Sequence, residues 1–398
     1  MGPLEERAMD PMTCVAFAWL AAYAATAAYA STRAAYARVL HHARHGPTNA
    51  KVCTSIVLVR PCAGIEPHLA RALRSSGCAR TRVPLHVRIA IGSAEDAAYG
   101  VALDAARDLR ASGIDAEVVV TRAEGPNHKA DQIARALAQA PHVDVVVVAD
   151  SDVDLDGVDL DVFVAPILRG NVVASWAAPV EVAPTSSADR VSAAVLDASL
   201  HAFPLLAALD PGGMAGKLVA IDANALARVG GFGALVGHLG EDMELARRLR
   251  AEGGRVALAP FIARSLACDR SAREVLARYT RWLLVIRAQR TWLLATYPLV
   301  LACVPLLLLL CAIAAAREGW PAAVAFALVL TTRAAVAFSA RALTRCDGRV
   351  RRRGLVAGAL LADLLLLVAF VRALGPARFA WRARSLRLGA RGSLEAVR

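Results

Sequence analysis

Four long apolar stretches, one near the start of the chain and three in its last third, constrain the fold of this 398-residue sequence most strongly. Each has at least 18 residues and at most one charge, which is enough to cross a bilayer as a helix. They are Met12–Thr32, Thr291–Ala316, Trp320–Ala340 with Arg333 inside it, and Gly354–Val371 with Asp363 inside it. The mean hydropathy of +0.46 excludes a disordered chain and a simple soluble domain. Buried core helices are the alternative, and they fit the Ala-rich first segment better than the Leu-rich second one.

Charges beside these segments predict how the chain is placed in the membrane. Glu5, Glu6 and Asp10 precede the first segment, whereas Arg33 and Arg38 follow it, so the region after it is expected in the cytoplasm. The same rule puts the basic loop 341–353 in the cytoplasm. It does not fit the chain beyond Arg372, which would lie outside if Gly354–Val371 spans the bilayer. A re-entrant or interfacial position of that segment is the open alternative.

The net charge of +12 is concentrated at the C-terminal end of the chain. From Arg341 to Arg398 there are thirteen arginines and only three acidic residues, which leaves about +2 for the rest. A basic surface of this kind binds nucleic acid or anionic lipid headgroups. Apart from Phe379 and Trp381 the tail has no interleaved aromatic residues, so we predict anionic membrane lipids and no nucleic acid as its partner.

Between the apolar segments, strand-like and helical patterns alternate in the chain. Strands are expected at 54–59, ended by Arg60-Pro61, and at 85–91, 116–121 and 143–149, with helices between them. This alternation predicts an α/β domain with a mostly parallel sheet, in which ligands bind beyond the carboxyl ends of the strands. The predicted regions are an anchor and basic linker (1–50), the α/β domain (51–290), membrane or interfacial helices (291–371) and an Arg-rich tail (372–398).

Two carboxylates follow the most hydrophobic strand of this domain. Asp150 and Asp152 project from the end of the run Val143–Ala149, where they can share a divalent cation with the phosphates of a nucleotide. A pair of this kind also occurs by chance in many chains, so its position at a strand end is what favours a metal site.

Two further clusters carry chemistry in their residue types. Glu241 and Asp242 open a helix, where acids also simply complement the helix dipole. Arg278 and Arg281 share one face of a later helix with Trp282 beside them. Two guanidinium groups can bind phosphates and an indole can stack on a base or sugar, but such residues also anchor helices at a membrane surface. The residues alone do not decide whether this cluster binds phosphates or anchors a helix at a membrane surface.

Taken in order, these motifs resemble family 21 and processive-type family 2 glycosyltransferases. The similarity is to ceramide glucosyltransferase and bacterial hopanoid glycosyltransferases, and it covers about residues 51–292. The segments that carry it are Ser55–Pro67, Gly125–Lys129, Asp150–Asp152, Glu241–Asp242 and Arg278–Trp282.

The resemblance implies a GT-A fold, a UDP-sugar donor and Mg²⁺ or Mn²⁺ held by Asp150 and Asp152. It implies that Asp242 is the catalytic base, and that the donor is bound by Lys129, Glu241, Arg278, Arg281 and Trp282. The family's aspartate-rich stretch after the second strand begins here with Ser93, so Glu95 or Asp96 is expected to contact the uridine or ribose instead.

The resulting hypothesis is a metal-dependent inverting glycosyltransferase that moves a sugar, glucose first, from a UDP-sugar to a membrane lipid hydroxyl such as that of ceramide. Transfer of N-acetylglucosamine to a hopanoid is the alternative with the same chemistry. A non-catalytic, membrane-tethered sensor of nucleotide sugars or lipids is the alternative from another class. The expected location is the bacterial inner membrane, in a multi-pass arrangement with a cytoplasmic catalytic domain.

Overall fold

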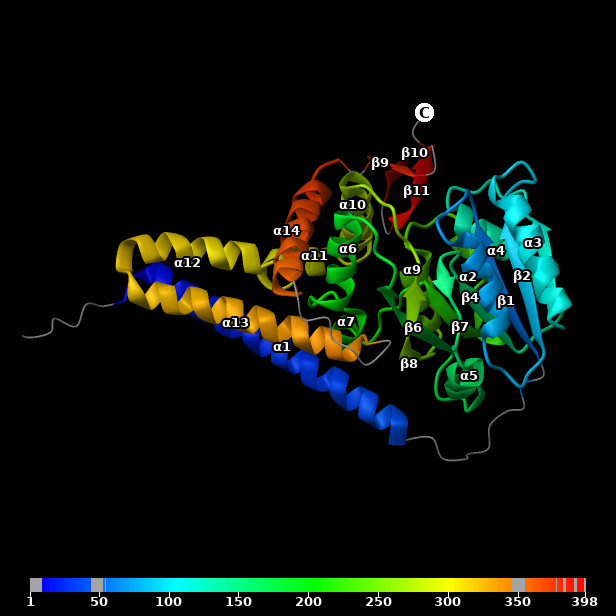
Figure 1. Ribbon diagram of the computed structural model, residues 1–398, viewed down its shortest axis with the longest axis horizontal. Coiled ribbons are helices and arrows are strands. Elements are labelled where there is room, and N and C mark those ends of the chain that lie inside the picture. Colours follow the sequence, from blue (N-terminus) through cyan, green and yellow to red (C-terminus); the bar gives the residue numbers. More distant parts are fainter. Residues whose placement is uncertain are drawn as a thin grey trace, which may run out of the picture.

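The computed structural model describes residues 9–43, 53, 55–345, 355–376, 378–381, 384–389 and 392–396. At its centre is an eight-stranded sheet with helices on both faces, and long apolar helices extend away from it (Figure 1). This architecture confirms the predicted α/β class with a mostly parallel sheet. It also has the expected apolar helices, which precede and follow the sheet domain in the sequence.

The order of the strands in the sheet is β3-β2-β1-β4-β7-β6-β8-β5. β1 pairs in parallel with β2 and β4, and β2 pairs in parallel with β3. β7 is antiparallel to both β4 and β6, β6 is parallel to β8, and β5 is antiparallel to β8. The strands are β1 (Ile56–Cys62), β2 (Leu85–Ile91), β3 (Asp115–Val120), β4 (Val145–Ala149), β5 (Val153–Asp154), β6 (Ala174–Glu181), β7 (Leu218–Asp222) and β8 (Val256–Ser265).

The first strand is longer than predicted, because it continues through Arg60 and Pro61 to Cys62. Proline cannot donate to a ladder and is therefore rare inside central strands. Here β1 pairs with β4 only from Ile56 to Val59, whereas its pairing with β2 continues to Cys62. Pro61 lies beyond the β4 ladder, so its missing N–H interrupts no pairing on that side.

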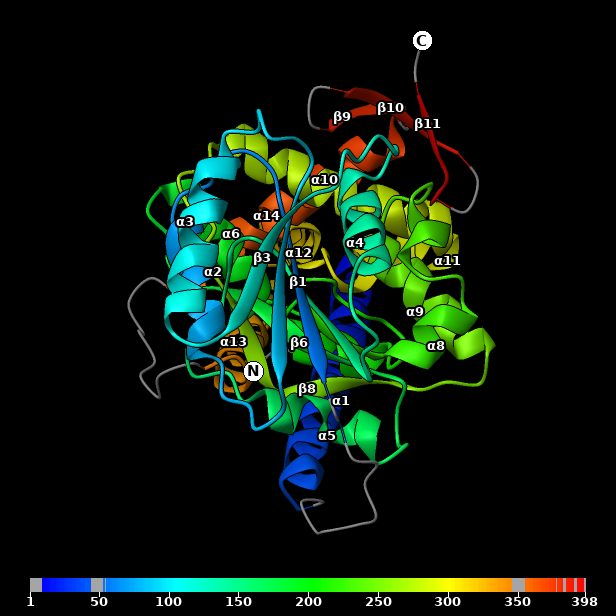
Figure 2. The same cartoon turned by 90° about the vertical axis from the view of Figure 1, so that its right-hand side faces the viewer.

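Alternate side chains of the central strands enter two separate cores. One core contains Ile56 and Leu58 and is covered by α2 (Leu69–Arg74), α3 (Ala98–Ala111) and α5 (Leu160–Leu168). The other contains Val57 and Val59 and is covered by α4 (His128–Ala138), α8 (Ala223–Arg228) and α9 (Glu241–Ala251). Figure 2 shows α2 and α3 on one side of the sheet and α4, α8 and α9 on the other. Helices on both faces explain why β4 is apolar without alternation.

Three further helices connect the sheet to the apolar helices: α6 (Ser187–Asp197), α7 (Phe203–Leu209) and α10 (Ala272–Gln289). α10 begins with a capping box, in which Ser271 and Glu274 satisfy each other's backbone N–H groups. Two short 3₁₀ turns, η1 (Ser75–Cys78) and η2 (Phe232–Leu235), complete the domain.

Among the described residues, three helices are long and apolar enough to cross a membrane: α1 (Pro11–Ala43), α13 (Trp320–Leu343) and α14 (Leu355–Leu374). The predicted segment 291–316 is not one helix, because it breaks at Leu301–Cys303 into α11 (Thr291–Val300) and α12 (Val304–Glu318). These two halves are bent by 43°, so they form either a broken span or a re-entrant pair. Figure 1 shows α1, α12 and α13 together as a long arm, with α14 running across its direction.

The Arg-rich tail contains a small antiparallel sheet of β9 (Arg378–Trp381), β10 (Arg384–Leu388) and β11 (Leu394–Ala396). Leu386, Leu388 and Leu394 are buried in the core that α6, α10 and α14 share. The prediction of an Arg-rich surface segment therefore missed this packing, in which leucines between the arginines tie the tail to the rest of the protein.

Candidate active site

Residues from three separated segments meet at the carboxyl end of β4. Asp150 follows this strand directly. Lys129 lies in the first turn of α4, two residues after the N-cap residue Asn127. Lys129 Nζ lies 2.7 Å from Asp150 Oδ1 and 3.1 Å from Glu241 Oε1, at the start of α9. Asn127 Nδ2 donates a 3.0 Å hydrogen bond to the other oxygen of Glu241. The structure thus brings together three of the predicted site residues, Lys129, Asp150 and Glu241.

A buried arginine holds the backbone of the loop that carries Asp150. Arg60 in β1 is fully buried and donates from Nη2 to the backbone oxygens of Asp150 (3.1 Å) and Val153 (2.8 Å). Its Nη1 donates to Ser76 Oγ at 3.0 Å. A buried guanidinium with these partners fixes the backbone of residues 150–153 before any ligand binds.

Sequence reasoning did not single out Lys217, which lies beside both predicted metal ligands. Lys217 Nζ is 2.6 and 2.7 Å from the two carboxylate oxygens of Asp152 and 3.3 Å from Asp150 Oδ2. Burial alone would raise the pKa of Asp152, but Lys217 and a 2.5 Å hydrogen bond from Ser265 Oγ lower it to about 2. One signal was present in the sequence: the chain has only three lysines, and two of them, Lys129 and Lys217, are here.

Asp242 is held at the N-terminus of α9 by two backbone N–H groups. Its Oδ2 accepts a hydrogen bond from Gly216 N and its Oδ1 accepts one from Met243 N, both at 2.8 Å. A Cβ at Gly216 would lie 3.0 Å from that of Asp242, so glycine permits this close approach. Burial, together with the neighbouring charge of Glu241, raises the pKa of Asp242 to about 6. A carboxylate with this pKa suits a general base that works near neutral pH.

The carboxylates of this cluster fit a divalent cation bound together with phosphates. Three carboxylates, those of Asp150, Asp152 and Glu241, share the two ammonium groups of Lys129 and Lys217. The side chain of Asp150 is 21% exposed, whereas that of Asp152 is 5% exposed and contacts Lys217. In the described part of the chain, no three His, Cys, Asp or Glu side chains converge on one metal position. Mg²⁺ typically takes one or two carboxylates and completes its coordination with substrate phosphates and water, and this donor set is compatible with that pattern.

Two other carboxylates near this edge have different surroundings. Glu66, which the sequence motif contains but the site prediction omitted, accepts a 2.9 Å hydrogen bond from Ser151 Oγ, and burial raises its pKa.

Asp96 Oδ1 accepts from Gly64 N at 2.8 Å and from Ala98 N at 2.9 Å, so it joins the loops after β1 and β2. Glu95 is hydrogen-bonded to Ser93 in the same loop. Contact of Glu95 or Asp96 with a uridine stays a prediction.

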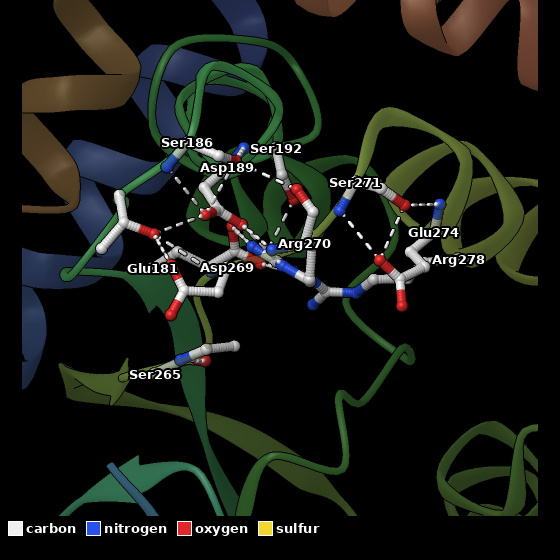
Figure 3. A network of polar contacts seen from close by, with 12 residues as sticks. Glu181, Ser186, Asp189, Ser192, Ser265, Asp269, Arg270, Ser271, Glu274 and Arg278 are labelled. Atoms are coloured by element: carbon white, nitrogen blue, oxygen red, sulfur yellow. Dashed lines mark hydrogen bonds and ion pairs between the residues drawn. The ribbon is translucent and has the colours of Figure 1, made fainter. Parts of the chain in front are cut away.

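Arg278 belongs to a network of buried charges rather than projecting freely toward the cluster (Figure 3). It forms an ion pair with Glu181 at the end of β6, and Arg270 Nη2 lies 2.6 Å from the other oxygen of the same carboxylate. Arg270 Nε also contacts Asp189 at 2.9 Å. The positive charge of Arg278 still lowers the pKa of Asp152, after the larger effects of burial and Lys217. A role of Arg278 on a diphosphate remains a prediction, and it requires rearrangement of this pair.

Trp282 continues the same helix and packs in an aromatic cluster. Its ring lies 5.2 Å from that of Tyr279 and 5.9 Å from that of Phe203, both edge to face, with the Arg278 guanidinium 5.0 Å from its centre. Arg281 lies three residues after Arg278 on α10 and is partly buried. The predicted trio therefore shares one helix, while its contacts to a donor are untested.

The sheet with helices on both faces and a carboxylate–lysine cluster at the end of β4 is compatible with a glycosyltransferase of the GT-A type. The family model for glycosyl transferase family 21 matches residues 16–394, and the chain belongs to that family.

Comparison with solved structures supports the fold. A mannosyltransferase from Pyrobaculum calidifontis, solved with GDP-mannose and Mn²⁺, aligns over 91% of this chain and 99% of its own, with 19% identity and a TM-score of 0.52. Glucosyl-3-phosphoglycerate synthase from Mycobacterium tuberculosis, solved with Mn²⁺ and UDP-glucose among other ligands, aligns over 56% of this chain and 75% of its own. Its identity is 21% and its TM-score is 0.34. A search of curated proteins found no significant match.

Proposed function

We propose that this protein is a metal-dependent inverting glycosyltransferase that moves a hexose, glucose first, from a UDP-sugar to a membrane lipid hydroxyl such as that of ceramide. One observation carries the proposal: Lys129 and Lys217 flank Asp150 at the carboxyl end of β4, and the half-buried base candidate Asp242, held by Gly216 N, lies in the same cluster. N-acetylglucosamine transfer to a hopanoid uses the same residues and is an outcome of the same assay.

The donor half of the site is built for a diphosphate. Lys129 and Lys217 are two donors of positive charge on either side of Asp150, and both stay protonated because their carboxylate partners raise their pKa values against the effect of burial. A divalent cation held by Asp150 and Asp152 would supply further charge for the departing nucleotide diphosphate. The two ammonium groups orient the diphosphate and stabilise the negative charge that develops on it during transfer.

The acceptor half of the site needs a single base. In an inverting displacement the acceptor hydroxyl attacks the anomeric carbon directly, and one carboxylate takes its proton. Asp242 fits this role, because its oxygens are oriented by Gly216 N and Met243 N and burial raises its pKa to about 6. Lys129 contacts both Asp150 and Glu241, and so connects the donor cluster to the residue beside the base.

The lipid acceptor is supported by how the site is joined to the apolar helices. α10, which carries Arg278 and Trp282, is followed after one residue by α11, and it packs along α14. Phe203 at the start of α7 touches Trp282, while Leu205 of the same helix is buried against the arm that contains α1. The candidate site and the candidate membrane helices are therefore adjacent parts of one packed structure.

The raised pKa of Asp242 predicts a pH dependence of transfer. Because the base must be ionised, kcat/KM should fall as the pH drops through about 6. Removing the neighbouring negative charge with Glu241→Gln should move this acid limb to lower pH, since Glu241 raises the pKa of Asp242. The check is the pH profile of both proteins at saturating donor. An acid limb that does not move in Glu241→Gln would contradict this assignment.

Removing the Lys217 ammonium should weaken donor binding. Lys217→Met keeps the length of the side chain but loses a charge-assisted contact worth roughly 1.5–3 kcal/mol, so UDP affinity should fall about tenfold to a hundredfold. Lys217→Arg keeps the charge and should lose less. Titration calorimetry with UDP measures both variants, and an unchanged affinity in Lys217→Met would show that this lysine does not contact the donor.

A further inference from the structure

α14 exposes a continuous apolar row along one of its faces. Leu361, Leu364, Val368 and Val371 follow one another at intervals of three and four residues, which places them on one side of the helix. Each is between 40% and 60% exposed. The opposite face, with Ala362, Leu366 and Ala369, is buried in the core shared with α6 and α10. α14 thus has one face on the catalytic domain and one apolar face without a protein partner among the described residues.

The C-terminal end of α14 is fixed to the catalytic domain. Arg287 near the end of α10 donates from Nη1 to the backbone oxygens of Ala373 (2.8 Å) and Gly375 (2.7 Å). The chain that follows stays on this side, because Leu239 N donates to Gly392 O and Leu394 N donates to Gly237 O, both at 2.8 Å. Residues 237–239 precede Glu241 and Asp242 directly, so β11 lies beside the loop that leads into the candidate base.

The helix before α14 also ends at the catalytic domain. Arg341, near the end of α13, forms a 2.6 Å ion pair with Asp197 at the end of α6. The far tip of the arm lies away from the catalytic domain. There, Arg317 near the C-terminal end of α12 contacts Met12 near the N-terminal end of α1. The C-terminal end of α13 and the C-terminal end of α14 are therefore both attached to the catalytic domain.

The two charges inside the apolar segments meet at the joint between the arm and the catalytic domain. Arg333 of α13 forms a two-point ion pair with Asp363 of α14, at 2.5 and 3.1 Å. Arg333 Nη1 also donates to the backbone oxygen of Ala198, just after α6, at 2.6 Å. The midpoint of α14 is thus bound to the catalytic domain through Arg333, as its C-terminal end is through Arg287.

We propose that α14 lies in the plane of the membrane surface on the catalytic side, with the row Leu361, Leu364, Val368 and Val371 inserted among the lipid acyl chains, and that it does not cross the bilayer. The row contacts the same bilayer that the arm of α1, α12 and α13 enters. A helix in the plane of the membrane surface buries its apolar face at the boundary between headgroups and acyl chains, and in α14 the other face is covered by α6 and α10 instead of water. The basic tail then lies on the side of the membrane that the positive-inside rule favours, which removes the conflict that a spanning α14 creates.

The side on which the tail lies is tested with reporter fusions to the C-terminus of the full chain in a bacterial inner membrane. Green fluorescent protein fluoresces only in the cytoplasm, and alkaline phosphatase is active only outside it. We expect a fluorescent first fusion and an inactive second one, at equal amounts on immunoblots. Phosphatase activity with a dark fluorescent protein would show that α14 crosses the bilayer and would overturn the proposal.

The depth of α14 is tested by spin labels in reconstituted vesicles. Leu361→Cys, Leu364→Cys, Val368→Cys, Val371→Cys and, for comparison, Leu328→Cys are introduced one at a time into a variant whose native cysteines are replaced and whose melting temperature is unchanged. The four sites on α14 span about 15 Å along the helix axis. An in-plane helix gives all four labels the same ratio of accessibility to oxygen and to a water-soluble nickel chelate, shallower than that of Leu328 on α13. A steady change of depth along the row contradicts the proposal, as does exclusion of both reagents, which would indicate a second copy of the chain on this face.

Discussion

Replacing Asp242 by asparagine should reduce sugar transfer by about a hundredfold to ten-thousandfold while leaving the affinity for UDP within about twofold. The amide cannot take a proton from the acceptor hydroxyl, but it has nearly the shape of the carboxylate, and its oxygen can still accept one of the two backbone hydrogen bonds. The Asp242 oxygens contact backbone N–H groups of Gly216 and Met243, and the donor cluster is held by other side chains. The loss should therefore appear in kcat and not in donor binding. Steady-state kinetics and titration calorimetry with UDP measure the two quantities.

Asp222→Asn is a matched control for this variant. Asp222 is the N-cap of α8 and accepts a hydrogen bond from Ala225 N at 2.7 Å, and asparagine is an equally good cap. It should therefore retain both activity and UDP affinity. If Asp242→Asn transfers sugar as fast as the unaltered protein, Asp242 is not the base. If its melting temperature also falls far below that of the control, a rate loss would reflect misfolding.

Replacing Asp150 by alanine should abolish the part of UDP affinity that depends on a divalent cation. The accessible carboxylate of the pair is lost, and Asp152 remains behind Lys217. UDP affinity in the presence of Mn²⁺ should fall by at least about tenfold. Affinity without metal should stay the same or rise, because the variant frees Lys129 and Lys217 from a competing carboxylate. These opposite signs distinguish a metal ligand from a residue that merely supports the fold.

The experiment compares UDP titrations with and without Mn²⁺ in both proteins. Asp156→Ala removes an exposed carboxylate from the same acidic segment and should behave like the unaltered protein. Equal stimulation by Mn²⁺ in Asp150→Ala and the unaltered chain would remove Asp150 from the metal site.

The sequence predicted the first half of the sheet and five of the residues that the structure brings together at the end of β4: Lys129, Asp150, Asp152, Glu241 and Asp242. β2 has the predicted bounds, and Asp150 follows β4 as the buried run indicated. Lys217 was missed for a physical reason: it joins the site because β7 pairs antiparallel with β4, with Leu218 opposite Ala149. Local hydrophobic patterns predict that a strand exists but not which strand it pairs with.

The tail shows the opposite situation, in which a local signal was present and charge obscured it. Leu386 and Leu388 are buried while Arg387 between them is exposed, which is the two-residue alternation of a strand. Net charge describes what a segment attracts, and says little about its fold. Arg278 was similarly read from its own helix alone, because its partner Glu181 lies 97 residues earlier, at the end of β6.

The most direct test of the central claim is a transfer assay with the purified full chain. The protein is incubated with Mn²⁺, a bacterial lipid extract supplemented with ceramide, and one of several UDP-sugars, and the lipids are analysed by mass spectrometry. The proposed function predicts a lipid that gains one hexose from UDP-glucose, in the unaltered protein but not in Asp242→Asn. A gain of N-acetylhexosamine on a hopanoid would keep the mechanism and change both substrates. UDP-sugar binding without any glycosylated lipid, from any donor, would contradict an enzymatic role and favour a sensor.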